Sequence, residues 1–96
     1  MSNHTPTPVT KRPGFRFLRL PQTLELRGTC RSKHYLEVNV GTFTPPLKIG
    51  RAIVWPDYEV YALNAATLRG ASDDELKALV TELLDARKTA ARGEAA

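Results

Sequence analysis

The stretch from Gly28 to Trp55, GTCRSKHYLEVNVGTFTPPLKIGRAIVW, decides the fold of this chain. It starts with a glycine turn, continues through a short segment with positive charge at its front end, and passes two prolines before a short hairpin. This order is typical of a helix-turn-helix followed by a wing, in which the first turn of the second helix meets base edges and phosphates in a major groove. The pattern therefore predicts a DNA-recognition helix over residues 31–39, whose first turn carries Arg31, Ser32, Lys33 and His34.

The length and composition indicate one small domain of ordinary globular type. The chain has 96 residues, of which 42% are hydrophobic and 25% charged, and a chain of roughly 100 residues buries a single modest core. No apolar run approaches the ~20 residues that a membrane span requires, and the polar N-terminus lacks the apolar segment of a signal peptide. We therefore expect a cytoplasmic protein without membrane contact.

The residues that usually carry catalysis or metal binding are few and far apart. The chain has one cysteine, Cys30, and two histidines, His4 and His34. A single cysteine excludes an internal disulfide, and together with two histidines far apart in sequence it makes a poor zinc site. No nucleophile stands beside a base at a recognised spacing, and there is no glycine-rich phosphate loop. We expect no enzyme, metal, cofactor or small-molecule ligand, and a structural role for Cys30 rather than a redox switch.

The charge is divided unevenly along the chain. Residues 1–69 carry ten Lys or Arg against four acids, whereas residues 70–96 carry four against six, so the net charge of +4 combines +6 and −2. A basic domain is attracted to phosphate backbones by a term that does not depend on sequence. The charge therefore favours double-stranded DNA as the partner of the front two thirds, although many small basic proteins bind no nucleic acid.

The first fourteen residues are polar, contain three prolines and are expected to form a disordered arm. Lys11 and Arg12 of this arm could follow a phosphate backbone or enter a minor groove; the alternative is a solvated tail. After the arm, the alternating FRFLRL of residues 15–20 predicts an extended lead-in that continues the domain over residues 15–69. On its core side we expect Phe17, Leu18 and Leu20.

The first helix of the pair is predicted over residues 21–27, because proline suits the first turn of a helix. Leu24 is its clearest core position, and Gly28 is placed to end it in a left-handed conformation. Thr29 or Cys30 stands where the second helix begins, and Thr29 is the chemically better N-cap, since its hydroxyl can accept a bond from a free first-turn amide. Arg27, at the end of the first helix, joins the candidate DNA contacts.

Two short strands, Leu47–Ile49 and Ala52–Trp55, are predicted after the prolines, joined at Gly50 and Arg51. Lys48 and Arg51 would then lie side by side near the tip, where a DNA-binding wing contacts the backbone. The alternative is an ordinary surface hairpin. The apolar residues expected in the core of this region are Tyr35, Val38, Phe43 and Trp55.

The C-terminal segment, residues 70–90, predicts an amphipathic helix of its own, after a helix over residues 56–68. Ser72 and Glu75 form a capping box, and apolar residues follow at helical spacing as far as Leu84. The helix itself is expected from about Asp73 to Lys88. This stripe either packs within the chain, which so small a domain favours, or pairs with a second copy, which two DNA half-sites favour. We expect dimerisation, and a frayed tail over residues 91–96. The stripe consists of Leu76, Leu79, Val80, Leu83 and Leu84.

Taken together, the run CRSKHYLEVNVGTFTPPLKIGRAIVWPDYEV resembles the signature of the AlpA-type prophage regulators. This bacterial and phage family is related to the excisionases and, more distantly, to the DNA-binding domain of MerR-type regulators. The resemblance covers about residues 17–68. The matching positions are Leu20, Pro21, Arg31, Ser32, Tyr35, Gly41, Phe43, Pro46, Lys48, Gly50, Arg51, Trp55, Glu59 and Val60.

The resemblance implies a mainly α winged helix-turn-helix with a small β-hairpin, which binds promoter or attachment-site DNA and regulates transcription of a prophage or other mobile element. It assigns base contact to residues 31–34 by position. An excisionase with the same domain is one alternative, and an interaction adaptor that uses the 76–84 stripe is another. The chain departs from the family pattern at Cys30, His34, Glu37 and Thr44, and its hairpin turn is one residue shorter.

Overall fold

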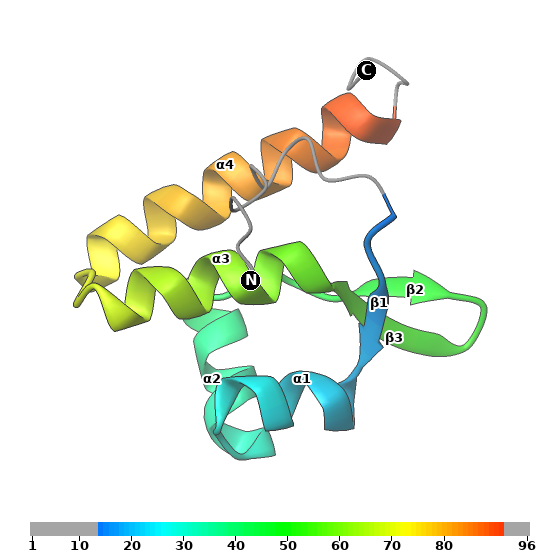
Figure 1. Ribbon diagram of the computed structural model, residues 1–96, viewed down its shortest axis with the longest axis horizontal. Helices are drawn as coiled ribbons and strands as arrows, with labels where there is room; N and C mark the ends of the chain where they lie inside the picture. Colours follow the sequence, from blue (N-terminus) through cyan, green and yellow to red (C-terminus); the bar gives the residue numbers. More distant parts are fainter. Residues whose placement is uncertain (1–13, 92–96) are drawn as a thin grey trace, which may run out of the picture.

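Glycines and prolines divide the chain into short elements, and the computed structural model describes residues 14–91 of it (Figure 1). Four helices and a three-stranded antiparallel sheet make up this part of the chain. The predicted arm, with Lys11 and Arg12, and the predicted tail lie outside the described residues, apart from their last and first residue. In chain order the elements are β1 (Phe17–Arg19), α1 (Leu20–Arg27), α2 (Arg31–Val40), β2 (Leu47–Ile49), β3 (Ala52–Pro56), α3 (Asp57–Leu68) and α4 (Asp73–Ala91).

The turn between α1 and α2 forms as the sequence predicted, except for its cap. Gly28 has a φ of 66°, and its amide donates to the Leu24 carbonyl at 2.9 Å, which ends α1. The residue that caps α2 is Cys30, without a side-chain bond, so the prediction of Thr29 as N-cap was wrong. The Thr29 amide also donates to the Leu24 carbonyl, at 3.2 Å. Thr29 therefore completes the end of α1, and α2 begins at Arg31, as the sequence predicted.

The inner side of α1 differs from the prediction. Thr23 is fully buried, and its hydroxyl donates to the Arg19 carbonyl at 3.0 Å. Leu24, predicted as the clearest core position, is only half-buried. The more buried side of α1 includes Leu20, Thr23 and Arg27, at spacings of three and four.

The sheet has one strand more than the predicted hairpin. β3 lies in the centre, antiparallel to both β1 and β2, with Leu18 opposite Trp55 and Lys48 opposite Ile53. Alternation along β1 turns Leu18 inward, at 1% exposure, and Phe17 outward, at 43%. The prediction that Phe17 packs on the core was therefore wrong. The mainly helical class with a small sheet is confirmed.

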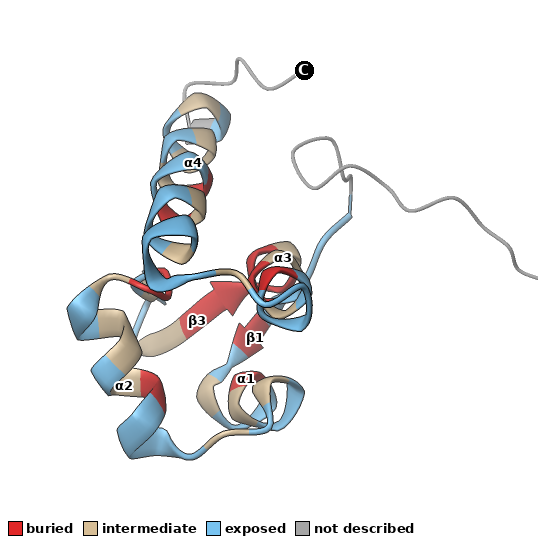
Figure 2. Cartoon of the chain, turned by 90° about the vertical axis from the view of Figure 1, so that its left-hand side faces the viewer, coloured by how far each residue is buried: buried red, intermediate tan, exposed pale blue. Residues whose placement is uncertain are grey.

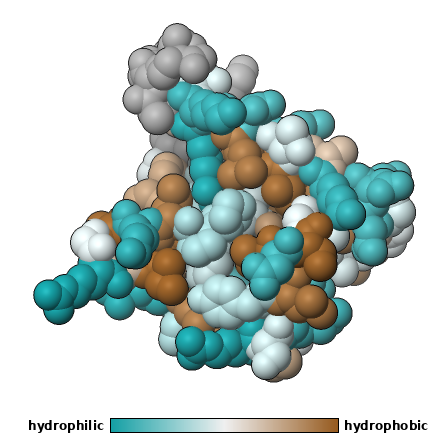
Figure 3. All heavy atoms as spheres, turned by 180° about the vertical axis from the view of Figure 1, so that it is seen from behind, coloured by the Kyte–Doolittle hydropathy of each residue, from teal (hydrophilic) through white to brown (hydrophobic). Residues whose placement is uncertain are grey.

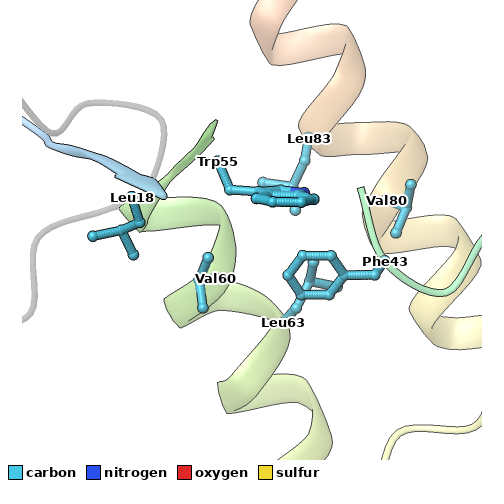
Figure 4. Packing of buried hydrophobic residues seen from close by; sticks show 7 residues of the cluster. All are labelled: Leu18, Phe43, Trp55, Val60, Leu63, Val80 and Leu83. Carbon is cyan, nitrogen blue, oxygen red and sulfur yellow. The ribbon is translucent and has the colours of Figure 1, made fainter. Parts of the chain in front are cut away.

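A single hydrophobic core joins the sheet to both long helices. Trp55 from β3 and Phe43 from the α2–β2 connection are buried, as predicted. Figure 4 shows Val80 and Leu83 of α4 pointing toward these two rings. The cluster of buried residues contains Leu18, Phe43, Trp55, Val60, Leu63, Val80 and Leu83.

α4 lies against α3 in the same chain (Figure 1). The predicted capping box is present: the Glu75 amide donates to Ser72 Oγ at 3.2 Å, and the Ser72 amide donates to Glu75 Oε1 at 2.8 Å. The stripe packs within the chain, because Val80 and Leu83 are only 6% and 4% exposed. These two side chains are thus not free to form a dimer interface, whereas dimerisation itself stays a prediction. The helix continues to Ala91 rather than ending at Lys88.

Candidate nucleic-acid interface

The first turn of α2 lies at the surface of the protein. Arg31, Ser32 and Lys33 are exposed, as their proposed role requires. The Lys33 ammonium lies 3.3 Å from a Glu37 oxygen one turn later, while 62% of its side chain remains exposed. The Arg31 guanidinium lies 5.9 Å from the centre of the Tyr35 ring. Two cations and a hydroxyl are therefore available to a ligand at this end of the helix.

His34, the fourth candidate of this turn, is not at the surface. It is fully buried and is the one buried residue of α2, whose ribbon is otherwise intermediate or exposed (Figure 2). Its ring makes edge-to-face contacts with Trp55 at 4.6 Å and with Phe43 at 5.1 Å between centroids. A buried imidazole cannot reach a base edge, so the predicted DNA contact by His34 was wrong. His34 and Val38 are four residues apart, a spacing that could have placed both on the inner side of the helix.

Arg27 lies beneath α2 and binds to it. Its Nη1 donates to His34 Nδ1 at 2.9 Å, and its Nη2 donates to the Glu37 carboxylate. The guanidinium also lies over the Phe43 ring, 4.0 Å from the centroid. Only 13% of the side chain is exposed. Arg27 therefore links α1 to α2 within the buried part of the protein. Its predicted role as a DNA contact was wrong, because its guanidinium is bound to His34 and Glu37.

The charge states of this cluster follow from its burial. Arginine is always protonated, so His34 Nδ1 accepts its bond and the neutral ring carries its proton on Nε2. Burial, together with the positive charge of Arg27, lowers the pKa of His34 to about 4. Burial alone would raise the pKa of Glu37, but the hydrogen bond and charge of Arg27, with Lys33, hold it below its usual value. At neutral pH the cluster holds a neutral imidazole beside an ion pair.

Acidification is expected to destabilise the fold through His34. The pKa of this imidazole is about 4 when folded, against 6.5 for the free side chain, so between these values only the unfolded chain binds the proton. The contribution of neutral His34 to the free energy of unfolding is therefore fully present above pH 6.5. It decreases as the pH falls toward 4, by about 3 kcal/mol in all. Urea unfolding followed by circular dichroism across this range measures the slope.

One substitution provides the test of this assignment. His34→Gln removes the titrating group and should flatten the dependence between pH 6.5 and 4. The depressed pKa of Glu37 adds a further loss of stability that begins as the pH falls through the ordinary value of 4.5, because the unfolded chain then takes up a proton that the folded carboxylate does not. An unaltered slope in His34→Gln would contradict the assignment.

Residues 42–46, which connect α2 to the hairpin, are held by three different elements. The Thr42 amide donates to the carbonyl of Glu37 in α2 at 3.0 Å. The Thr44 carbonyl accepts a bond from Trp55 Nε1 of β3 at 2.8 Å. The Pro45 carbonyl accepts a bond from an arginine of α4, also within 3 Å. The base of the hairpin is therefore fixed relative to α2, the sheet and α4.

The hairpin itself carries the two predicted cations at the surface. β2 and β3 are joined by the two-residue turn of Gly50 and Arg51, and Figure 1 shows the hairpin projecting away from the helices. Lys48 and Arg51 are exposed, and neither forms an ion pair with the residues from 14 to 91. Ile49, between them, is 51% exposed. The hairpin therefore presents two cations without an ion-pair partner among residues 14–91, and in sequence they come after the exposed first turn of α2.

The sequence reasoning missed an ion pair between α3 and α4. Glu59 is fully buried and accepts two bonds from Arg87, from Nε at 2.7 Å and from Nη2 at 2.6 Å. The same Nη2 donates to the Pro45 carbonyl at 2.9 Å. Arg87 follows Leu83 by four residues and so continues the buried side of α4. An arginine at that position of an apolar stripe was the available signal.

Other surface features give no chemical site. Figure 3 shows apolar patches interspersed with hydrophilic surface on the side opposite to Figure 1. A groove of about 460 Å³ lies between α3 and α4. Among residues 14–91, no three side chains of His, Cys, Asp or Glu are placed to hold a metal ion, and none of the helices combines the length and apolar character of a membrane span. The groove is lined by Ala66, Arg69, Ala71, Glu75, Ala78, Leu79 and Glu82.

Comparison with known proteins finds no protein-family model, no curated protein and no solved structure that matches this chain. The function must therefore be argued from the geometry of the residues themselves. That geometry leaves Arg31, Ser32 and Lys33 on α2, and Lys48 and Arg51 on the hairpin, as the candidate contact residues among those described.

Proposed function

We propose that this protein is a winged helix-turn-helix that binds double-stranded DNA. In this proposal α1 and α2 are the helix pair, the first turn of α2 enters the major groove, and the β2–β3 hairpin is the wing on the phosphate backbone. Arg31, Ser32 and Lys33 face the bases and phosphates. Lys48 and Arg51 contact phosphates and so position the protein without reading sequence.

One observation carries the proposal: five exposed polar or cationic side chains lie on α2 and on the hairpin, and both elements are anchored on the same buried cluster around Phe43. Beneath α2, Arg27 and His34 are packed on Phe43, and beneath the hairpin Trp55 is hydrogen-bonded to the connection that contains Phe43. Rigid support of this kind is what a recognition surface needs, because residues that must meet a groove together have to keep their relative positions.

The biological role that we propose is transcriptional regulation of a prophage or other mobile element, with an excisionase as the alternative. The resemblance of residues 17–68 to AlpA-type regulators supports both, because both classes place a helix in the groove and a wing on the backbone. Chromatin immunoprecipitation distinguishes them: enrichment at a promoter supports a regulator, and enrichment confined to an attachment site supports an excisionase. A second copy on adjacent half-sites would need a surface other than Val80 and Leu83, which are buried.

Removal of the four exposed cations is expected to weaken DNA binding by about a hundredfold at low salt. Arg31, Lys33, Lys48 and Arg51 would each release counterions from the duplex, so the slope of log affinity against log salt should decrease by about one for each residue replaced by alanine. Fluorescence anisotropy with a labelled mixed-sequence duplex, at several salt concentrations, measures both quantities.

A control of matched charge separates contact from general attraction. Changing Lys77 and Lys88 of α4 to alanine removes two exposed cations, and the salt slope should hardly change. Changing Lys48 and Arg51 removes the same charge, and the slope should decrease by about two. Negligible binding of the wild-type protein at low salt, or undiminished binding by the fourfold variant, would reject the proposed function.

A further inference from the structure

We infer that Arg87 of α4 is a positioning residue for the β2–β3 hairpin. This inference rests on the proposed function for its effect on DNA binding, but its structural part can be tested without DNA. The hydrogen bonds of Arg87 reach Glu59 and Pro45, which lie outside the hairpin and the first turn of α2. Arg87 acts on the connection from which the hairpin leaves.

The geometry around Arg87 joins three parts of the chain that are far apart in sequence. Its Nε and Nη2 hold both oxygens of Glu59 in α3, at 2.7 and 2.6 Å, and Nη2 also holds the Pro45 carbonyl at 2.9 Å. Glu59 is fully buried, and only 16% of the Arg87 side chain is exposed. A two-pronged bond to a buried carboxylate fixes the plane of the guanidinium. The plane in turn fixes where the Pro45 carbonyl can lie.

Pro45 is well placed to transmit this constraint. It lies two residues before β2, and Pro46 follows it, so the connection is stiff at the point where Arg87 holds it. Trp55 holds the preceding carbonyl, that of Thr44. Two adjacent carbonyls are thus held by β3 and by α4, and together they set the direction in which β2 leaves.

Only arginine can make all three bonds from one side chain. Lysine in its place could keep an ion pair with Glu59, but its single ammonium lacks the planar fork that serves the carboxylate and a carbonyl at once. Arg87→Lys is therefore the informative variant. It is expected to remain folded and to loosen the Pro45 contact selectively.

The first experiment uses the full chain without DNA. In Arg87→Lys, ¹⁵N relaxation dispersion and amide exchange by NMR should show increased motion of residues 46–53, while α1 and the first turn of α2 keep their wild-type behaviour. Lys88→Ala, at the next position and exposed, is the matched control and should change neither region. Unchanged dynamics of residues 46–53 in Arg87→Lys would overturn the inference whatever the protein binds.

The second experiment asks through which contacts Arg87 affects DNA binding. Arg87→Lys is expected to reduce affinity for the mixed-sequence duplex about fivefold in the wild-type background, and equally in a background with Arg31 and Lys33 changed to alanine. With Lys48 and Arg51 changed to alanine, it should have no further effect, because effects transmitted through the same contacts do not add. The inference would be overturned if Arg87→Lys reduced the affinity as much in the Lys48 and Arg51 background as in the Arg31 and Lys33 background. It would also be overturned if Arg87→Lys did not reduce the affinity of a wild-type protein that binds DNA.

A second variant covers the case in which Arg87→Lys does not fold. Replacing Glu59 and Arg87 together by methionine removes the buried ion pair without leaving a lone charge, and such replacements often preserve stability. This variant lacks the bond to Pro45 and should show the same loosening of residues 46–53. A rigid hairpin in the folded double variant would count against a positioning role. Failure of all DNA binding, with loosening of the hairpin still observed, would reject the proposed function but not the role of Arg87.

Discussion

A chain that ends at Arg69 is expected to be unfolded at 25 °C. The truncation removes Val80 and Leu83 from the core and the partly buried Leu76, Leu79 and Leu84 from its edge. Burial of one such side chain contributes about 1.5–3 kcal/mol, and small domains have total stabilities of only about 5–15 kcal/mol. The truncation also leaves Glu59 buried without Arg87, and breaking a buried pair in this way costs about 3–5 kcal/mol.

Far-UV circular dichroism and urea unfolding of the two lengths provide the measurement. A chain that ends at Ala91 keeps all of α4 and should unfold cooperatively, as the full chain does, whereas the chain that ends at Arg69 should show no cooperative transition. Adding a peptide of residues 70–91 should restore part of the signal if the missing contacts are the cause. A folded chain of residues 1–69 would show that the core does not depend on α4.

The second large effect is expected from Trp55→Ala. Trp55 is fully buried, and its ring lies among those of His34, Tyr35 and Phe43 at centroid distances of 4.6–6.4 Å. Removal of a buried tryptophan side chain typically costs about 3–5 kcal/mol, since the cavity that remains collapses only in part. The Thr44 carbonyl also loses its indole donor. We expect a variant that is largely unfolded, or that unfolds at much lower urea than the wild type.

Trp55→Phe divides this effect into its two parts. It keeps an aromatic ring in the core but removes the donor to Thr44, so we expect a smaller loss, of about 1–3 kcal/mol for the unpaired carbonyl and the lost volume. Unfolding should be followed by circular dichroism, because Trp55 is the only tryptophan and its fluorescence is lost in both variants. A loss below about 1 kcal/mol in Trp55→Ala would contradict the packing described.

Much of the secondary structure could be predicted because its signals are local. Gly28 ends α1, Ser72 and Glu75 cap α4, and a two-residue turn separates β2 from β3. Each of these signals acts within a few residues of the chain, where backbone conformation and capping bonds are decided. Strand β1 had only a short alternating signal, and its pairing with β3 depends on residues some 37 positions away, as between Leu18 and Trp55.

The candidate surface was predicted in part, for the same reason. The exposure of Arg31, Ser32, Lys33, Lys48 and Arg51 follows from position on a helix or hairpin. For His34 the local signal was only its spacing from Val38, because its burial depends on the rings of Phe43 and Trp55 and on a bond from Arg27. The sequence indicates a DNA contact for a polar residue in the first turn of a charged helix, and only the structure shows the rings that surround it.

The sequence by itself indicated the four helices and the β2–β3 hairpin, the position of the turn between α1 and α2, and which half carries the positive charge. Only the tertiary structure decided that the α4 stripe is buried by its own chain, that Arg27 and His34 lie inside, and that Arg87 reaches both Glu59 and Pro45. Local signals depend on neighbouring residues and survive in any context. Burial and ion pairing depend on which surfaces meet, and in this protein residues as far apart in sequence as Pro45 and Arg87 are brought together.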